Sequence, residues 1–368
     1  MTSASLLVET LRIIPAASAR VLADGWAHAD TDALLALAEH EGAAIWLQQR
    51  LKALNIRLPD AAQDRLKAST RPALVNTLRV DAEASACLAR LSGAGIPAVP
   101  LKGAAVRRLA ARVPLIDARA VSDVDILVEE QQAERAWSIL CSQGYTALKA
   151  TGPEDGHHLA ALSSPLGVPV ELHVSTVAAV APAEAWRRAT RDGTMASFDG
   201  TMRPIPGDTE LLWHVMSHAL VTGSELAREG LRLRYWLDAA ALLATGVAID
   251  WERIRQRLTS AEAPRPVLFR AWLRTAALLA GVELPSAALG APGRPLHLER
   301  MLAWRLRLLP TFRHDRWAAT LFEEGTRGEA GLPLHAGDAG DTLGERVRHA
   351  AAGCAARAWW IIRRQERP

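Results

Sequence analysis

Hydrophobic residues recur at spacings of three and four through residues 5–92, as in the leucines between positions 34 and 37 and between 66 and 88. That spacing places them on one face of an α-helix and so predicts amphipathic helices. Asp30 is a candidate N-terminal cap for one of these helices, and Pro59 is a start signal for the next. We therefore predict an all-helical N-terminal region over residues 1–92.

The pattern changes after Gly93 and Gly95. Short apolar or alternating runs, typical of strands, follow at 96–101, 121–128, 145–149, 157–163 and 168–175. Helical patterns begin at Lys102, extending to about position 112, and cover 129–143 up to Gly144. Residues 164–167 (SPLG) are a candidate hairpin turn. This predicts a small mixed sheet with helices over residues 93–180.

Helical periodicity returns after Pro182 and defines a second helical region over residues 181–322. The helical runs are at 208–221, 231–243, 251–258 and 267–281. The last region, 323–368, is predicted to be a glycine-rich loop at 323–341 followed by a helix at 343–364. The fold class is therefore predicted to be α+β, with a small mixed β-sheet core embedded between N-terminal and C-terminal helical regions.

Composition narrows the possible function. The 368 residues are 49% hydrophobic and 23% charged, which is ordinary for a globular protein. The 43 basic and 40 acidic residues leave a formal charge of +3, so bulk charge does not indicate binding to long nucleic acids. Only four of the basic residues are lysines, at positions 52, 67, 102 and 149, which draws attention to Lys102.

The cysteines and the apolar runs bear on the compartment. Cys87, Cys141 and Cys354 are an odd number and far apart, which favours neither a disulfide framework nor a zinc site. No run approaches the roughly 20 apolar residues that span a bilayer, and the N-terminus lacks the basic leader of a signal peptide. We expect a cytoplasmic protein without integral membrane association.

The most informative motif is residues 122–128, SDVDILV. Residues two apart on a strand share a face, so Asp123 and Asp125 are expected to project together. Two adjacent carboxylates repel one another, and a divalent cation with oxygen ligands relieves the repulsion. The alternative interpretation is a strand that begins at its solvent end with two hydrated aspartates.

Two further motifs favour the metal site. Upstream, Lys102 and Gly103 lie at a predicted strand-to-helix turn, where a glycine lets backbone N–H groups approach a phosphate. Downstream, Glu171 and His173 share one face of the predicted strand 168–175. A third carboxylate beside two aspartates is typical of two-metal sites for phosphoryl or nucleotidyl transfer.

Taken in order, these motifs resemble a bacterial family of nucleotidyltransferases in the polymerase-β superfamily. The resemblance spans residues 101–258. It rests on LKG at 101–103, Arg119, SDVDILV at 122–128, GY at 144–145, VELH at 170–173, LLWH at 211–214 with His218, and YWLD at 235–238. The implied fold is a small nucleotidyltransferase sheet flanked by helices, in agreement with the pattern above.

The resemblance implies roles for individual residues. Asp123 and Asp125 would ligate two Mg²⁺ ions, with Mn²⁺ as a substitute, and Glu171 would be the third carboxylate, which binds the catalytic metal and helps to deprotonate an acceptor hydroxyl. Gly103 would hold the triphosphate, and Lys102 or Arg119 would neutralise it. The full nucleotide-binding set is expected to be Lys102, Gly103, Arg119, Ser122, His173 and Asp238.

Several residues have a structural interpretation beside the functional one. His214 and His218 are four apart on a predicted helix and are expected to line the site or the core rather than bind metal. Asp238 could face the nucleotide or pair with an arginine such as Arg232 or Arg234. His157 and His158 are expected at an exposed strand end, with contact to the carboxylates as the alternative. The aromatic and basic tail at 359–364 is expected to pack on the body of the protein, with contact to a membrane surface or a partner as the alternative.

The function predicted is a Mg²⁺-dependent transfer of a nucleoside monophosphate from an NTP such as ATP to an acceptor hydroxyl or phosphate, releasing pyrophosphate. The expected partners are the NTP donor and a small-molecule, peptide or protein acceptor. Two alternatives remain. One is a degenerate module that binds nucleotide or a partner without catalysis, favoured by Ala104 where a serine or glycine is usual. The other is a metal-dependent D-x-D glycosyltransferase.

Overall fold

The structure is a computed structural model of the chain. It describes residues 1–109, 117, 119–148, 158–177, 180–221, 232–246, 249–285 and 295–312. The predictions for residues 110–112, His157, the loop at 323–341 and the helix and tail at 343–364 lie outside these residues.

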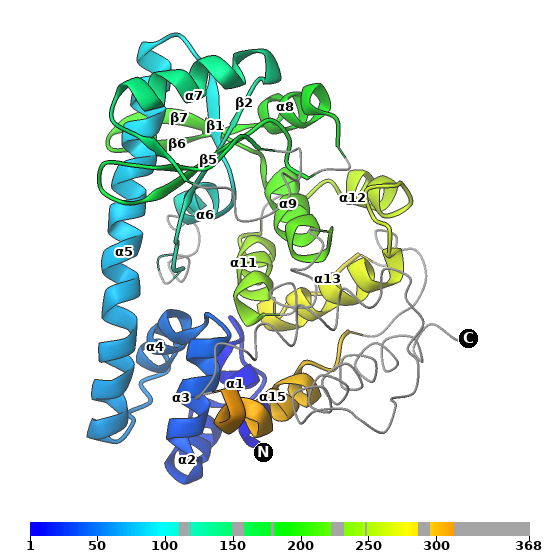
Figure 1. The fold of residues 1–368 in the computed structure, drawn as a ribbon. Coiled ribbons are helices and arrows are strands. Elements are labelled where there is room, and N and C mark those ends of the chain that lie inside the picture. Colours follow the sequence, from blue (N-terminus) through cyan, green and yellow to red (C-terminus); the bar gives the residue numbers. More distant parts are fainter. Residues whose placement is uncertain are drawn as a thin grey trace, which may run out of the picture.

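Helices form the N-terminal region, as the periodicity predicts. They are α1 (Ser3–Leu11), α2 (Ala19–His28), α3 (Thr31–His40), α4 (Ala44–Ala53) and α5 (Asp60–Gly93). The Asp30 side chain accepts a hydrogen bond from the Ala33 N–H and caps α3, and Pro59 is the residue before the first turn of α5. Helix α5 runs from the N-terminal helices up to the sheet (Figure 1), so it ties these two parts of the molecule together.

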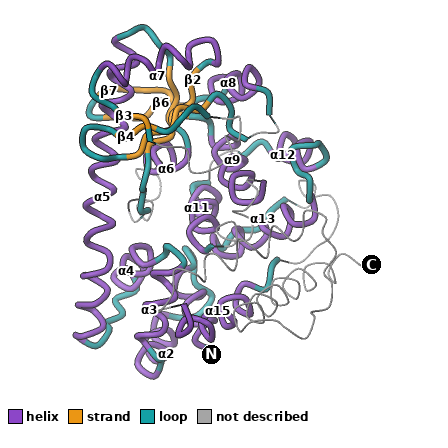
Figure 2. The backbone as a smooth tube through the Cα atoms, viewed as in Figure 1, coloured by secondary structure: helices purple, strands orange, loops and turns teal. Residues whose placement is uncertain are grey.

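The middle of the chain forms a mixed sheet of five strands, which confirms the predicted fold class. The strands are β1 (Ala98–Pro100), β2 (Val124–Val128), β3 (Thr146–Ala147), β4 (Leu162–Ser163) and β5 (Pro169–His173), in the order β1-β2-β5-β4-β3. Strands β2 and β5 are parallel, whereas the other neighbouring pairs are antiparallel. Figure 2 shows the strands gathered at one end of the molecule.

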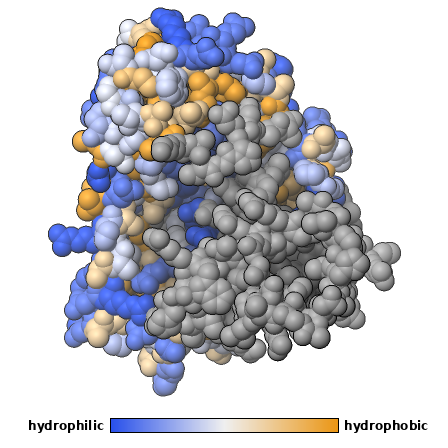
Figure 3. Space-filling model, in the orientation of Figure 1, coloured by the Kyte–Doolittle hydropathy of each residue, from blue (hydrophilic) through white to orange (hydrophobic). Residues whose placement is uncertain are grey.

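Both faces of the central strands are covered. Val124, Ile126 and Val128 of β2 belong to the main core, to which α5 and the helix α7 (Ala133–Ser142) contribute. Leu127 points to the other face and packs with Val99 of β1 and with Ala189 of α8 (Pro182–Arg191). The outer end of the molecule, over α7, carries mainly hydrophilic side chains (Figure 3). Asp125 therefore lies on a strand that is buried on both sides.

Helices return after the sheet, and a hairpin interrupts them. The described helices are α8, α9 (Asp208–Val221), α11 (Leu233–Ala244), α12 (Trp251–Leu258), α13 (Pro266–Ala280) and α15 (Leu298–Phe312). Helix α15 packs on α1 and α3, and the main hydrophobic core is continuous from the N-terminal helices through the sheet to α15. No described helix is long and apolar enough to cross a membrane.

The hairpin corrects the prediction of a purely helical region after Pro182. Strands β6 (Thr194–Phe198) and β7 (Thr201–Ile205) pair antiparallel around Asp199 and Gly200, both of which have positive φ. An Asp-Gly pair between two alternating runs is a strong signal for such a two-residue turn, so the sequence does contain the evidence for the hairpin.

The strand predictions around the site need smaller corrections. Strand β2 begins at Val124 rather than at residue 121, so Asp123 comes just before the ladder. In the predicted strand 157–163, only Leu162–Ser163 joins the sheet as a strand, and His158 forms an isolated bridge with His173.

Candidate functional site

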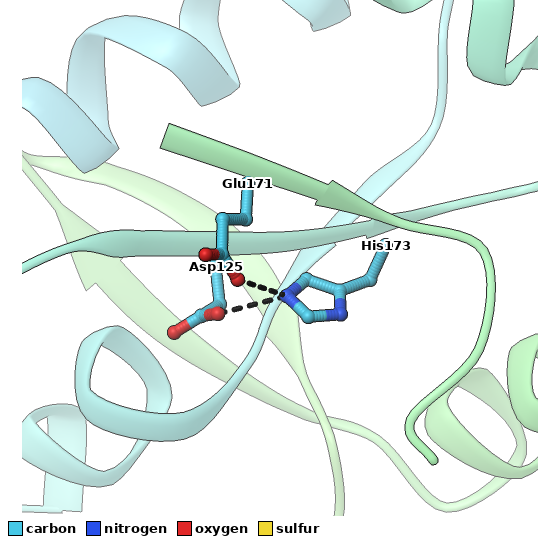
Figure 4. Close-up of side chains that lie close together, drawn as sticks. All are labelled: Asp125, Glu171 and His173. Atoms are coloured by element: carbon cyan, nitrogen blue, oxygen red, sulfur yellow. Dashed lines mark hydrogen bonds and ion pairs between the residues drawn. The ribbon is translucent and has the colours of Figure 1, made fainter. Parts of the chain in front are cut away.

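The register of the two parallel strands places Asp125 beside Glu171. These residues are directly paired across β2 and β5, and Leu127 is paired with His173 two positions further on. Because side chains two apart on a strand share a face, Asp125, Glu171 and His173 project to the same side of the sheet. Figure 4 shows the three side chains pointing toward one another. Glu171 and His173 lie on the same face of β5, as the sequence predicts.

His173 connects the two carboxylates. Its Nε2 lies 2.8 Å from Asp125 Oδ1 and 3.3 Å from Glu171 Oε2, and its side chain is fully buried. One ligand atom from each of Asp125, Glu171 and His173 lies within 4.8 Å of the others. These distances make the three residues a candidate site for a divalent cation.

Lys102 brings a positive charge to the same carboxylate oxygens. Its Nζ donates to Asp125 Oδ1 over 2.7 Å and lies 3.9 Å from Glu171 Oε2. Lys102 opens the short helix α6 (Lys102–Val106) with φ +42°, a left-handed conformation that is costly for a residue with a Cβ. The fold thus accepts a strained backbone at the residue that meets the carboxylates.

The pKa shifts follow from this charge cluster. Burial alone would raise the pKa of Asp125, but Lys102 and His173 hold it well below its ordinary value. The hydrogen bond from His173 lowers the pKa of Glu171 despite burial. Burial and Lys102 disfavour the charged imidazole of His173, yet its hydrogen bonds to Asp125 and Glu171 raise its pKa. Both carboxylates are therefore ionised at neutral pH.

Asp123 lies at the margin of this cluster. It is half-buried, and its Oδ1 accepts a hydrogen bond from the Ser122 hydroxyl over 3.0 Å. Burial, followed by repulsion from Asp125, raises the pKa of Asp123. Asp123 is outside the group of three whose ligand atoms all lie within 4.8 Å, because it precedes the first residue of β2 and the ladder does not hold it. Asp123 is therefore near enough to Asp125 for the two carboxylates to repel one another.

Gly103 is packed against Arg119 rather than open to solvent. A Cβ at position 103 would collide with Arg119 Nη1 and would lie 2.7 Å from Val121 Cγ1. Arg119 in turn donates from Nε to both carboxylate oxygens of Asp238, each over 2.9 Å. Asp238 on α11 is buried, and burial raises its pKa even though Arg119 acts in the opposite direction. Arg119 is therefore an arginine partner of Asp238, and the charge of Arg234, one of the two arginines considered above, also acts to lower the pKa of Asp238.

Histidines from neighbouring elements border the cluster. His158 is half-buried, with its ring centroid 5.5 Å from that of His173, so the expected exposed strand end is wrong for His158. His218 on α9 stacks edge-on against Tyr235 at 5.7 Å. Burial, and then the charge of Lys102, hold the pKa of His218 well below its ordinary value. His218 thus presents a neutral ring near the cluster, as expected for a residue that lines the site.

The donor set fits a hard divalent cation. The two ionised carboxylates supply the oxygen ligands that Mg²⁺ and Mn²⁺ prefer in proteins, and the imidazole of His173 lies within reach of both carboxylates. The Lys102 ammonium lies between Asp125 and Glu171, so the fold places a positive charge beside these two carboxylates. The charges of Asp125, Lys102 and Glu171 also act on Asp123, which therefore lies beside this cluster.

Comparison with known proteins bears on the same stretch of chain. The profile of a family described as "Uncharacterised nucleotidyltransferase" matches residues 27–279, well over half of the sequence. The chain belongs to this nucleotidyltransferase family. The match includes the LKG turn, the D-x-D strand, the E-x-H strand and Asp238. The family assignment therefore covers every residue of the candidate site.

Two other comparisons add less. The search of curated proteins found no protein that matches the chain. Among solved structures, the chain is similar to an antigenic nucleotidyltransferase-like protein from Paracoccidioides brasiliensis, with 17% identity and a TM-score of 0.38 over 58% of this chain and 97% of the other.

The structure thus brings together most of the residues that the sequence singled out. One cluster consists of Asp125, Glu171, His173 and Lys102. A second group consists of Gly103, Arg119 and Asp238, and it adjoins the first because Gly103 follows Lys102 in the chain. Sequence reasoning assigned Lys102 and His173 to the nucleotide, whereas both contact the carboxylates here. A side chain as long as lysine leaves no periodic signal of where its end lies, so the pattern alone could not reveal this contact.

Proposed function

We propose that the protein is a divalent-cation-dependent nucleotidyltransferase. It would transfer a nucleoside monophosphate from an NTP to an acceptor hydroxyl or phosphate and release pyrophosphate. The observation that carries the proposal is the pairing of Asp125 with Glu171 across two buried parallel strands, inside the stretch matched by the nucleotidyltransferase family. A fold places two ionised carboxylates side by side at a cost, and a cation site is the physical reason to retain them.

In this proposal Asp125 and Glu171 hold the cation, and Asp123 extends the site toward a second one. Mg²⁺ is the proposed ion, with Mn²⁺ as a substitute; when bound, it would supply the positive charge that stabilises the transferring phosphoryl group. Glu171 is exposed more than Asp125, with 27% of its side chain accessible against 2%, so an acceptor can reach it. We assign Glu171 to receive the proton of an acceptor hydroxyl.

The chemistry is a displacement at the α-phosphorus. The acceptor oxygen forms a bond to that atom while the bond to the β-phosphate oxygen breaks, and pyrophosphate departs with the electron pair. Arg119 is oriented by Asp238 and lies against Gly103, so its charge is positioned where the triphosphate would approach the backbone. Ser122 and His173 also belong to the proposed nucleotide-binding set. Their part is indirect, because Ser122 hydrogen-bonds Asp123 and His173 hydrogen-bonds Asp125.

The acceptor is proposed to be a small molecule, peptide or protein. The near-neutral charge balance, with +3 over 368 residues, does not favour the phosphate-tracking surface that a long nucleic acid needs. A second candidate function is a degenerate module that binds nucleotide without turnover. The ion pair of Lys102 and the hydrogen bond of His173 favour it, because they satisfy Asp125 without a metal.

The experiment is label transfer. The purified protein is incubated with Mg²⁺, a soluble metabolite extract and each of the four α-labelled NTPs, and the label and pyrophosphate are followed. The same assay is run on Asp125→Asn and on Asp24→Asn, a matched control at an exposed position of α2. Transfer by the wild type and Asp24→Asn, lost in Asp125→Asn, supports the proposal. Mg²⁺-dependent nucleotide binding without transfer would support the degenerate module instead.

A further inference from the structure

Two nitrogen donors, the Lys102 ammonium and the His173 imidazole, share one oxygen at the centre of the candidate site. Asp125 Oδ1 accepts from Lys102 Nζ over 2.7 Å and from His173 Nε2 over 2.8 Å. Asp125 is 2% exposed, so water does not replace either donor easily. This oxygen, the one that lies nearest to His173 and Lys102, is thus already engaged by two of the chain's own groups.

A divalent cation and the Lys102 ammonium are poorly compatible on that oxygen. Mg²⁺ binds oxygen at about 2.1 Å, and Nζ lies 2.7 Å away from the same atom. The two cations would then be separated by less than about 5 Å in a buried site, where like charges repel strongly. One of them has to leave when the other binds.

Lys102 is the group that can leave. His173 is fully buried on β5, whereas the Lys102 side chain is 18% exposed and reaches the carboxylates through a flexible four-carbon stem. Its backbone is held in the left-handed region at the start of α6, next to Gly103. Arg119 packs against Gly103. A released Nζ would therefore remain beside the turn to which the proposed function assigns the triphosphate.

We propose that Lys102 is an exchangeable counter-ion. It neutralises Asp125 and Glu171 when no metal is bound, and it transfers to the triphosphate when a divalent cation takes its place. That the receiving anion is a triphosphate rests on the proposed function. The exchange of Lys102 for a divalent cation does not. A consequence is that metal and triphosphate bind cooperatively, because each favours the position of Lys102 that the other needs.

The first test is metal affinity. Mn²⁺ binding to the full-length protein without nucleotide is followed by the electron paramagnetic resonance signal of free Mn²⁺. Wild type is compared with Lys102→Met, Lys102→Gln and the matched control Lys67→Met, a change at an exposed lysine of α5. A charged neighbour at this distance changes the affinity of a carboxylate for a bound cation by roughly ten- to a thousandfold, as judged from its effect on proton binding. We expect at least about tenfold tighter Mn²⁺ binding in both Lys102 variants, and wild-type affinity in Lys67→Met.

The second test uses the wild type alone. The chain has four lysines, so acetylation at each can be quantified by mass spectrometry, with exposed Lys67 as the internal reference. Saturating Mn²⁺ should raise the acetylation rate of Lys102 several-fold relative to Lys67. Adding inorganic tripolyphosphate together with Mn²⁺ should lower it again, because the released Nζ then pairs with the phosphates.

The outcomes separate the exchange from the proposed function. If Mn²⁺ binds and nucleotidyl transfer occurs, but the Lys102 variants bind Mn²⁺ no tighter and Lys102 acetylation does not respond, the exchange is wrong and the proposed function stands. If the variants bind tighter and Lys102 becomes reactive without any transfer, the exchange stands and the proposed function is wrong. Absence of Mn²⁺ binding in every variant would overturn both.

Discussion

Gly103→Ala tests the packing that joins the LKG turn to the second group of site residues. The added methyl would collide with Arg119 Nη1 and lie 2.7 Å from Val121 Cγ1, against the 3.5–4.0 Å at which carbon atoms normally meet. Arg119 is fixed by two 2.9 Å contacts to Asp238, and Val121 is buried, so neither group can yield freely. Overpacking of this kind costs about 1–3 kcal/mol.

A smaller effect opposes that cost. Gly103 lies within α6, where alanine is favoured over glycine by roughly 0.5–1 kcal/mol. The expected net loss in the free energy of unfolding is therefore about 1–2 kcal/mol. Gly93→Ala is the matched control, because a Cβ there meets no atom within 4 Å and Gly93 is the last residue of α5. The control should be neutral or slightly stabilising.

Urea unfolding followed by circular dichroism measures both variants. A double-mutant cycle with Asp238→Asn then locates the cause: if the methyl displaces Arg119 from Asp238, the cost of Asp238→Asn should be smaller by about 1 kcal/mol in the Gly103→Ala background. A Gly103→Ala protein as stable as Gly93→Ala, or costs that simply add, would refute the packing argument.

Two further predictions concern the charge cluster. Asp123→Asn should stabilise the metal-free protein at pH 7 and Asp125→Asn should destabilise it, because the pKa of Asp123 is raised, chiefly by burial, whereas that of Asp125 is lowered by Lys102 and His173. Ionised Asp123 costs stability as pH rises through its folded pKa, whereas ionised Asp125 contributes stability that is lost as pH falls through its own folded pKa. The effect of each substitution on the free energy of unfolding, measured by urea titration, should therefore shrink below pH 3.8, the ordinary pKa of aspartate. Equal effects of the two substitutions at pH 7 would contradict the opposite pKa shifts of Asp123 and Asp125. Lys102→Gly should be more stable than Lys102→Ala by about 1 kcal/mol, because only glycine adopts φ +42° without strain; equal unfolding midpoints would show that the left-handed turn is relaxed.

Local periodicity accounts for much of what the sequence predicts correctly. The helical spacing before residue 92 and the Asp30 cap produce α1–α5, and the apolar runs around Asp125 and Glu171 produce β2 and β5. Because strands have a period of two, the shared face of Glu171 and His173 also follows from sequence. The Asp-Gly turn of the β6–β7 hairpin is an equally local signal, but the helical periodicity of the region that follows Pro182 predicts helix there instead.

Local periodicity does not specify which side chains meet when they are far apart in the sequence. Arg119 and Asp238 are 119 positions apart, and nothing in either local pattern selects one for the other. The same holds for Lys102 and Asp125, where the end of a flexible side chain decides the contact. The tight cluster therefore contains His173 where the D-x-D motif suggested Asp123, because the β2–β5 register, rather than the spacing within one strand, determines which atoms converge.

The central claim is that this site breaks the bond between the α- and β-phosphates of an NTP. The most direct measurement supplies one NTP labelled at both the α- and γ-phosphates, with Mg²⁺ and acceptor extract, and follows where each label goes. We predict that the α-label becomes attached to the acceptor while the γ-label leaves in pyrophosphate, and that Asp125→Asn abolishes both events. Transfer of the γ-label to an acceptor, or its release as inorganic phosphate with the α-label left in a nucleoside diphosphate, would contradict the account.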